Sequence, residues 1–138
     1  MEETIKTLYE DSFLIIKFDE RIKLMCSYWT ENTSHLKEEE IKRLVTLFVN
    51  FLDEYTPDLI LSDDSKRSSV YPIELQEWIG NTIAMGAARS NTSKYAIILP
   101  QDLVSSLSTE QTVEEIIDIP FELKYFEDEE SAKKWFLE

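Results

Sequence analysis

The sequence predicts an α/β protein with a single-layer, mixed and mainly parallel β-sheet that is opened by an antiparallel hairpin. Two observations lead to this class. Residues 12–18 and 21–29 are short apolar or alternating segments around a polar break, which is typical of paired strands. Beyond them, segments with apolar residues at helical spacing alternate with short apolar runs, as in parallel strands joined by crossover helices. The predicted order is β-β-α-β-α-β-α-β-α.

The length of 138 residues and the 43% content of hydrophobic residues are sufficient for one domain with a buried core. We therefore expect residues 1–138 to form a single domain, in which residues 1–10 are loosely ordered or strand-like.

The hairpin is expected to turn at Asp19 and Glu20, and its second strand covers residues 21–29. Side chains alternate along a strand, so Cys26 and Tyr28 are expected on the same apolar face.

A long amphipathic helix is expected over residues 37–55, with Ser34 as its N-cap. Three glutamates follow the cap, where the helix dipole favours negative charge. Residues 59–61 are wholly apolar, which is typical of a strand buried on both faces.

The second half of the chain is expected to form a helix from about Pro72 to Ala88 and strands at residues 95–99 and 121–126. Residues 108–111 match a capping box and predict the start of a further helix at Ser108. Asp128 is the predicted N-cap of a terminal helix.

The charge excludes several classes of partner. The chain has 28 acidic and 14 basic residues, for a formal net charge of −14. Nucleic acid and anionic membrane surfaces are therefore disfavoured, and the short apolar runs predict no membrane insertion. A single cysteine and no visible signal peptide indicate a cytoplasmic protein.

Few catalytic constellations are available. Both glycines, Gly80 and Gly86, fall inside a predicted helix, so a glycine-rich phosphate loop is absent. Cys26 and His35 are the only residues of their types; we expect a buried thiol and a surface imidazole. No cofactor is expected.

One polar loop could bind a ligand or a partner, because open α/β sheets hold ligands beyond the carboxyl ends of their strands. It follows the strand at residues 59–61, and Asp63 and Asp64 within it are weak candidate ligands for Mg²⁺. The alternative is a solvated loop that only turns the chain. The candidate interaction or ligand residues are Ser62, Asp63, Asp64, Ser65, Ser68, Ser69, Tyr71 and Trp78.

The acidic residues concentrate toward the end of the chain, where residues 101–138 hold 11 acids and 3 bases. They are expected on helix starts, exposed faces and turns. A solvated surface explains them, and a docking face for a basic protein is the alternative.

The chain resembles the SpoIIAA-like branch of the STAS superfamily, a group of small bacterial proteins. The resemblance covers about residues 10–138 and is carried by Tyr28-Trp29 after the hairpin, by residues 58–61 and 95–100, and above all by residues 125–136, YFEDEESAKKWF. It implies a mixed sheet covered by helices. It also implies a regulatory protein–protein switch, as in anti-sigma-factor antagonists, or a small-molecule or lipid pocket. Lipid carriers of the CRAL-TRIO type are similar in architecture.

The family's phosphorylation site is not present in its usual position. Anti-sigma-factor antagonists carry a phosphorylated serine, after an aspartate, at the start of the helix that follows the third strand. Tyr71-Pro72 stands there in this chain. Ser65, Ser68 and Ser69 are the nearest possible phosphoacceptors.

Three functions are therefore open. The first is a non-catalytic regulatory or protein-interaction domain of the STAS type, which uses the polar loop with Tyr71 and Trp78 and for which a homodimer is one of the open oligomeric states. The second is a carrier or sensor of a small apolar ligand or lipid. The third is a Mg²⁺-dependent enzyme that uses Asp63 and Asp64.

Overall fold

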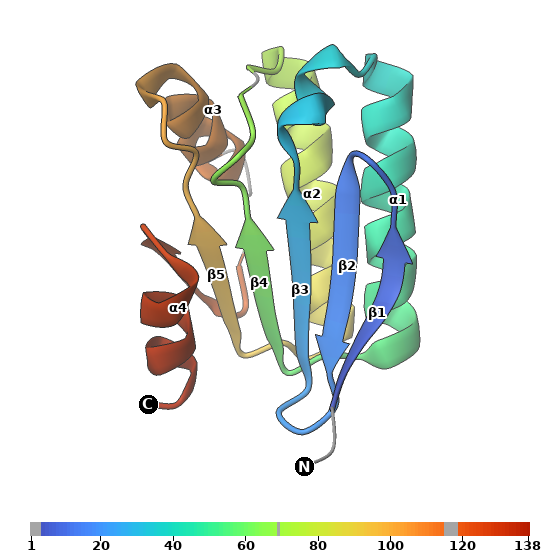
Figure 1. The fold of residues 1–138 in the computed structure, drawn as a ribbon, viewed down its shortest axis with the longest axis vertical. Coiled ribbons are helices and arrows are strands. Elements are labelled where there is room, and N and C mark those ends of the chain that lie inside the picture. The colour runs from blue at the N-terminus through green and yellow to red at the C-terminus, as the bar shows by residue number, and fades with distance from the viewer. Residues whose placement is uncertain (1–3, 69, 115–118) are drawn as a thin grey trace.

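The computed structural model describes residues 4–68, 70–114 and 119–138, which form a β-sheet with helices on both faces (Figure 1). The strands are β1 Ile5–Glu10, β2 Leu14–Asp19, β3 Leu24–Trp29, β4 Leu59–Asp63, β5 Lys94–Ile98 and β6 Glu122–Phe126. The helices are the 3₁₀-helix η1 Glu31–His35 and the α-helices α1 Glu38–Tyr55, α2 Ile73–Arg89, α3 Leu103–Glu114 and α4 Glu129–Phe136.

The sheet has the order β1-β2-β3-β4-β5-β6. β1, β2 and β3 pair in antiparallel fashion, and β3, β4, β5 and β6 pair in parallel. The predicted fold class, a mainly parallel sheet opened by an antiparallel hairpin, is confirmed. The carboxyl ends of β3 to β6 lie at one edge of the sheet, at the top of Figure 1, which we call the carboxyl edge.

The two faces of the sheet are covered unequally. Residues such as Ile16, Met25 and Ile60 pack with the buried residues of α1 and α2 on one face, which we call the helix face. Leu61 and Ala96 pack with the terminal helix α4 on the other, the α4 face. Figure 1 shows α1 and α2 behind the sheet and α4 at one side, so that none of the helices formed by the described residues stands in front of β1, β2 and β3.

The predicted start of the first long helix is corrected. Ser34 lies inside η1, whose N-cap Thr30 accepts a hydrogen bond from the Asn32 backbone N–H at 3.3 Å. α1 then begins after Lys37, where the Glu40 side chain accepts from the Lys37 backbone N–H at 3.3 Å. The polar segment between β3 and α1 therefore forms a short helical turn of its own.

Two further boundaries differ from the prediction. The hairpin turn follows Asp19 and includes Lys23 at a φ of 53°. The segment expected to be loosely ordered or strand-like contains the edge strand β1, which lies outside the predicted order of elements. The capping box predicted at Ser108 is wrong, because α3 already begins at Leu103. The side chain of Asp102 accepts from the Ser105 backbone N–H at 2.9 Å.

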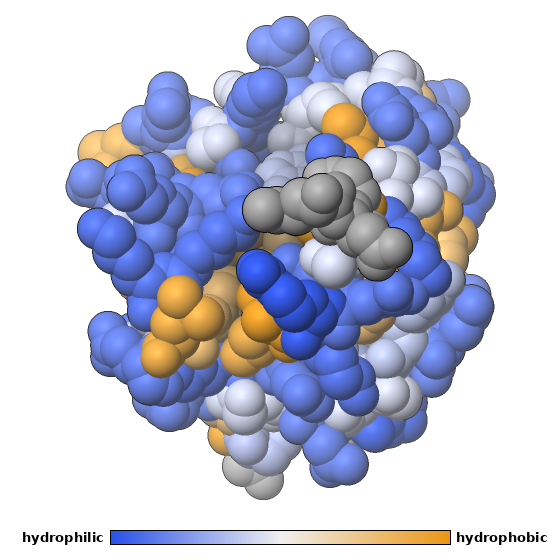
Figure 2. All heavy atoms as spheres, turned by 60° about the horizontal axis from the view of Figure 1, so that its bottom comes forward, coloured by the Kyte–Doolittle hydropathy of each residue, from blue (hydrophilic) through white to orange (hydrophobic). Residues whose placement is uncertain are grey.

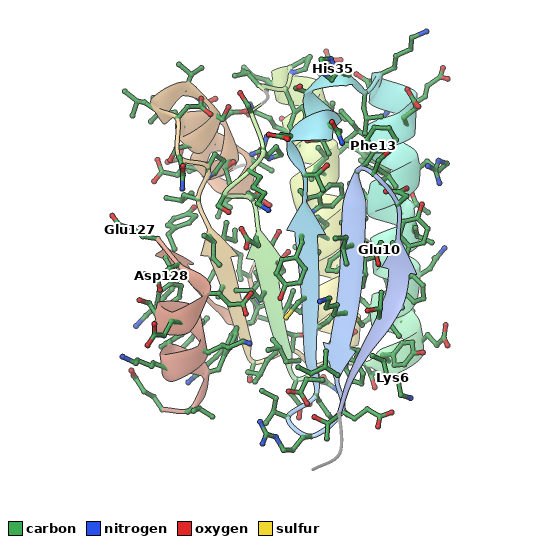
Figure 3. All side chains as sticks on the ribbon, viewed as in Figure 1. Lys6, Glu10, Phe13, His35, Glu127 and Asp128 are labelled. Carbon is green, nitrogen blue, oxygen red and sulfur yellow. The ribbon has the colours of Figure 1, made fainter. Side chains whose placement is uncertain are left out.

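The terminal helix begins as predicted. Asp128 is the N-cap of α4, and its Oδ1 accepts from the Ser131 backbone N–H at 2.8 Å. Glu127 and Asp128 lie just before α4, at the side of the molecule away from β1 (Figure 3).

The outer surface is largely hydrophilic where Figure 2 brings the end opposite the carboxyl edge forward, with smaller hydrophobic areas between the polar residues. Among the described residues, no helix combines the length and the apolar character that crossing a membrane requires.

Candidate functional site at the carboxyl edge

A chain of hydroxyl groups on the helix face leads to a buried carboxylate. Ser27 and Ser62 are neighbours in the β3–β4 register, and the Ser27 hydroxyl donates to the Ser62 Oγ at 3.4 Å. The Ser62 hydroxyl in turn donates to Oδ1 of Asp64 at 3.1 Å. The apolar strand β4 therefore ends in polar side chains that face the helices.

Arg67 provides the counterion for this carboxylate. Its side chain is only 5% exposed, the Asp64 side chain is 13% exposed, and Nε of Arg67 lies 3.7 Å from Oδ2 of Asp64. Burial raises the pKa of Asp64, and the nearby guanidinium and the Ser62 hydroxyl oppose that shift. A buried charge needs such partners because desolvation disfavours the ionised form.

The same guanidinium connects the loop to α3. Nη2 of Arg67 donates to Oγ1 of Thr109, and the guanidinium carbon lies 5.0 Å from the centre of the Tyr71 ring. Such stacking of a cation on an aromatic face is favourable, more so when both groups are removed from water.

The inner face of α3 consists of hydroxyl-bearing residues. Ser105, Ser108 and Thr109 are buried, and Thr112 continues the same face because positions three and four apart align on a helix. From α2, Nε2 of Gln76 donates to Oγ of Ser108 at 3.1 Å. α3 is therefore joined to α2 and to the loop largely through polar contacts.

Two adjoining cavities lie beneath α3, with volumes of about 70 and 80 Å³. Their walls are mostly apolar; Trp29 and Val45 border the first, and Tyr95 and Phe121 border the second. A concave, largely apolar space with a few convergent polar groups is the usual form of a small-ligand site. Both cavities are lined by Ser62, Asp64, Ile79, Ile83, Thr109 and Thr112.

The first two turns of α3 expose apolar residues. Leu103 is 72% exposed, Val104 is 62% exposed and Leu107 is 49% exposed. Glu110 and Glu114 follow at the spacing that places them on the same side of the helix. We call Leu103, Val104 and Leu107 the α3 outer surface; this helix exposes apolar residues and buries polar ones.

The structure brings some of the predicted site residues together. Ser62, Asp64 and Tyr71 all line the first cavity. Trp78 lies elsewhere on α2, where it packs beside Ile41 and Val45, and the Lys42 ammonium lies 5.3 Å from the centre of its ring.

The two adjacent aspartates do not converge. Asp63 pairs in register with Tyr28, on the α4 face, and its Oδ1 accepts from both the backbone N–H and the hydroxyl of Ser65, at 3.0 and 2.6 Å. Asp64 is directed to the helix face by its contacts with Ser62 and Arg67. Within the described ranges, no group of three or more His, Cys, Asp or Glu side chains is arranged to hold a metal ion.

The candidate phosphoacceptors differ in their surroundings. The Ser65 hydroxyl is engaged by Asp63, whereas Ser68 is exposed. Ser69 lies outside the described residues.

Cys26 and His35 do not form a catalytic pair. Cys26 is buried on the α4 face, and burial raises the pKa of its thiol to about 12. His35 is exposed in η1, at the top of the molecule in Figure 3.

Sequence reasoning missed Arg67 and the two-sided character of α3. The polar neighbours of Arg67 predict a solvated loop, not a buried guanidinium. The missed helix face does have a signal, because Ser105, Ser108, Thr109 and Thr112 recur at helical spacing. A helix that starts at Ser108 leaves Ser105 out of that pattern.

Comparison with known proteins gives no match to a family model, to a curated protein or to a solved structure.

Proposed function

We propose that the chain is a non-catalytic interaction domain of the regulatory type, and that its partner protein binds the α3 outer surface. The inverted burial of α3 is the observation that carries this proposal. The resemblance of the sequence to STAS proteins, whose anti-sigma-factor antagonists act through protein contacts, supports the same class of function.

Rotating α3 about its axis cannot bury its apolar residues without cost. Turning Leu103 and Leu107 inward would remove Thr109 from Arg67 and Ser108 from Gln76, leaving a buried cation and a buried amide without these partners. Burying one such apolar side chain stabilises by about 1.5–3 kcal/mol. A partner that covers the outer surface gains this energy without disturbing the inner face.

The charge near this surface selects the partner. Residues 101–114 contain Asp102, Glu110 and Glu114 and no basic residue. A complementary surface therefore has an apolar centre bordered by Lys or Arg, since opposite charges at a rim favour association and orient it.

The test compares two double variants of the full chain by affinity capture from the native cytoplasm, followed by direct titration of the captured protein. Leu103→Ser/Leu107→Ser removes the outer surface. Met85→Ser/Leu137→Ser is the matched control, because these residues are also exposed and apolar but lie on α2 and after α4.

A partner that binds the wild type and the control, and binds the α3 variant at least ~10-fold more weakly, supports the proposal. If the wild type and both double variants capture the same partner in equal amounts, the proposal is refuted. Light scattering identifies the case in which the partner is a second copy of this chain.

The cavities beneath α3 favour a second candidate function, that of a carrier or sensor of a small apolar ligand. An apolar cavity of about 150 Å³ holds benzene, so each cavity here accepts a short alkyl group beside the hydrogen-bonding groups of Asp64 and Thr109. Native mass spectrometry of freshly purified protein tests this candidate. A ligand that is retained by the wild type and lost in Ile83→Trp supports it, and an identical unliganded mass for both opposes it.

A further inference from the structure

A third hollow lies on the α4 face, between α4 and the part of the sheet that no helix covers. Its volume is about 170 Å³, and Leu24 and Cys26 contribute apolar surface to it. Four charged side chains surround it: Lys17 and Asp19 from β2, and Glu129 and Lys133 from α4.

The charges contributed by α4 neutralise each other. Oε2 of Glu129 lies 2.9 Å from Nζ of Lys133, and its Oε1 accepts a hydrogen bond from the Tyr28 hydroxyl at 2.9 Å. Both carboxylate oxygens of Glu129 are thus engaged.

The charges contributed by β2 are not satisfied in this way. Lys17 is half-buried in the middle of the strand, and its ammonium lies 5.8 Å from the centre of the Tyr28 ring. Across the parts of the chain that the structure describes, no residue forms an ion pair or hydrogen bond with that ammonium.

Asp19 is only 9% exposed. Its Oδ1 accepts from the Thr4 hydroxyl and from the Arg21 backbone N–H, at 2.9 and 3.0 Å. No residue within the described ranges donates to its Oδ2. The hollow therefore contains one unengaged donor group and one unengaged acceptor atom.

Lys17 and Asp19 present opposite charges to the same hollow. They are two positions apart on one strand, so their side chains leave the same face of the sheet, from Cα atoms about 7 Å apart. A small molecule that carries a carboxylate and an ammonium on one carbon atom has an opposite charge to offer to each of these side chains.

Electrostatics favours a zwitterion over a simple ion. The four charges around the hollow sum to zero, and the whole chain carries −14, so a free anion is repelled at long range. A free cation would leave Lys17 without a partner. A zwitterion satisfies both groups and adds no net charge.

We propose that this hollow binds a small α-amino acid, with its carboxylate on Nζ of Lys17 and its ammonium on Oδ2 of Asp19. Benzene, with six heavy atoms, occupies a cavity of about 150 Å³. A hollow of about 170 Å³ accordingly accepts an amino acid with a side chain as small as that of alanine or serine.

Isothermal titration of the full chain with L-alanine tests the proposal, with acetate and methylammonium as half-ligand probes. Saturable binding of L-alanine is expected, with each half-ligand at least ~10-fold weaker, a difference of about 1.4 kcal/mol. Lys17→Gln and Asp19→Asn are each expected to weaken L-alanine binding by a similar factor. The asparagine retains an acceptor for Thr4 and Arg21, so the fold is preserved.

Lys6→Gln is the matched control, because Lys6 is an exposed lysine of the neighbouring strand β1 that pairs with Glu20 outside the hollow. It is expected to bind L-alanine as the wild type does.

Three results would overturn the proposal: no saturation by L-alanine at ~10 mM, acetate binding as tightly as L-alanine, or unchanged binding in both β2 variants. The α3 double variant leaves this hollow intact, so the two proposals can fail independently.

Discussion

Replacing Arg67 by methionine tests whether the Asp64–Arg67 pair holds the carboxyl edge together. Methionine keeps an aliphatic side chain against Tyr71 but removes the guanidinium. Asp64, 13% exposed, then retains its hydrogen bond from Ser62 and loses the cation that lies 3.7 Å away. Breaking a buried pair from one side typically destabilises by about 3–5 kcal/mol. We expect about 3 kcal/mol here, because the two charges are not in direct hydrogen-bonding contact.

The loss of unfolding free energy in Arg67→Met should be larger at high pH than at low pH. Burial already raises the pKa of Asp64 above its ordinary value, and removal of Arg67 raises it further. A raised pKa in the folded state means that the ionised form opposes folding. The penalty in Arg67→Met is therefore complete above the folded-state pKa, and it disappears as the pH falls through that pKa toward the ordinary value.

Urea unfolding followed by tryptophan fluorescence, at pH 7 and at pH 5, measures both effects. The double variant Asp64→Asn/Arg67→Met should recover about 2 kcal/mol of the loss at pH 7, since no charge remains buried. A loss below about 0.5 kcal/mol at pH 7, or a loss of equal size at both pH values, would refute the reasoning.

Three further outcomes are expected. Gly86→Ala should lower the free energy of unfolding by about 1 kcal/mol in urea titrations. The new Cβ would lie 3.0 Å from Val49 and 3.2 Å from Leu52, and this crowding outweighs the better helix propensity of alanine; a stabilised variant would contradict this. Cys26 should resist alkylation in the native protein at pH 8, since its pKa is about 12 and its side chain is buried; rapid modification detected by mass spectrometry would show that the α4 face opens. Asp128→Ala should destabilise by about 1 kcal/mol through loss of the α4 cap, measured by thermal unfolding, and an unchanged midpoint would argue against that role.

The sheet and its long helices follow from local patterns that the sequence displays directly. Of the strand predicted over residues 21–29, β3 confirms residues 24–29, with Cys26 packed on the α4 face, and residues 21–23 belong to the turn. The helical spacing from residue 41 onward is confirmed by α1. In α1 one face packs on the core, so polarity and burial agree, whereas β3 is buried on both faces and Ser27 in it is only 1% exposed.

The carboxyl edge departs from these patterns because polarity and burial disagree there. Arg67 is charged yet buried, and Leu103 is apolar yet 72% exposed. A guanidinium can be buried only if the fold supplies partners around it. Asp64 and Tyr71 are close to Arg67 in the sequence, but Thr109 reaches it only because α3 packs over the loop. No local pattern contains that information.

The polar attachment of α3 has a consequence for how molecules reach the cavities beneath it. Hydroxyl and amide contacts exchange readily with water, whereas the packed face between α1 and the sheet does not. α3 should therefore detach, with faster amide hydrogen exchange than α1, at a small fraction of the free energy of global unfolding. Access to the interior then requires the movement of one helix and leaves strands β1 to β6 paired.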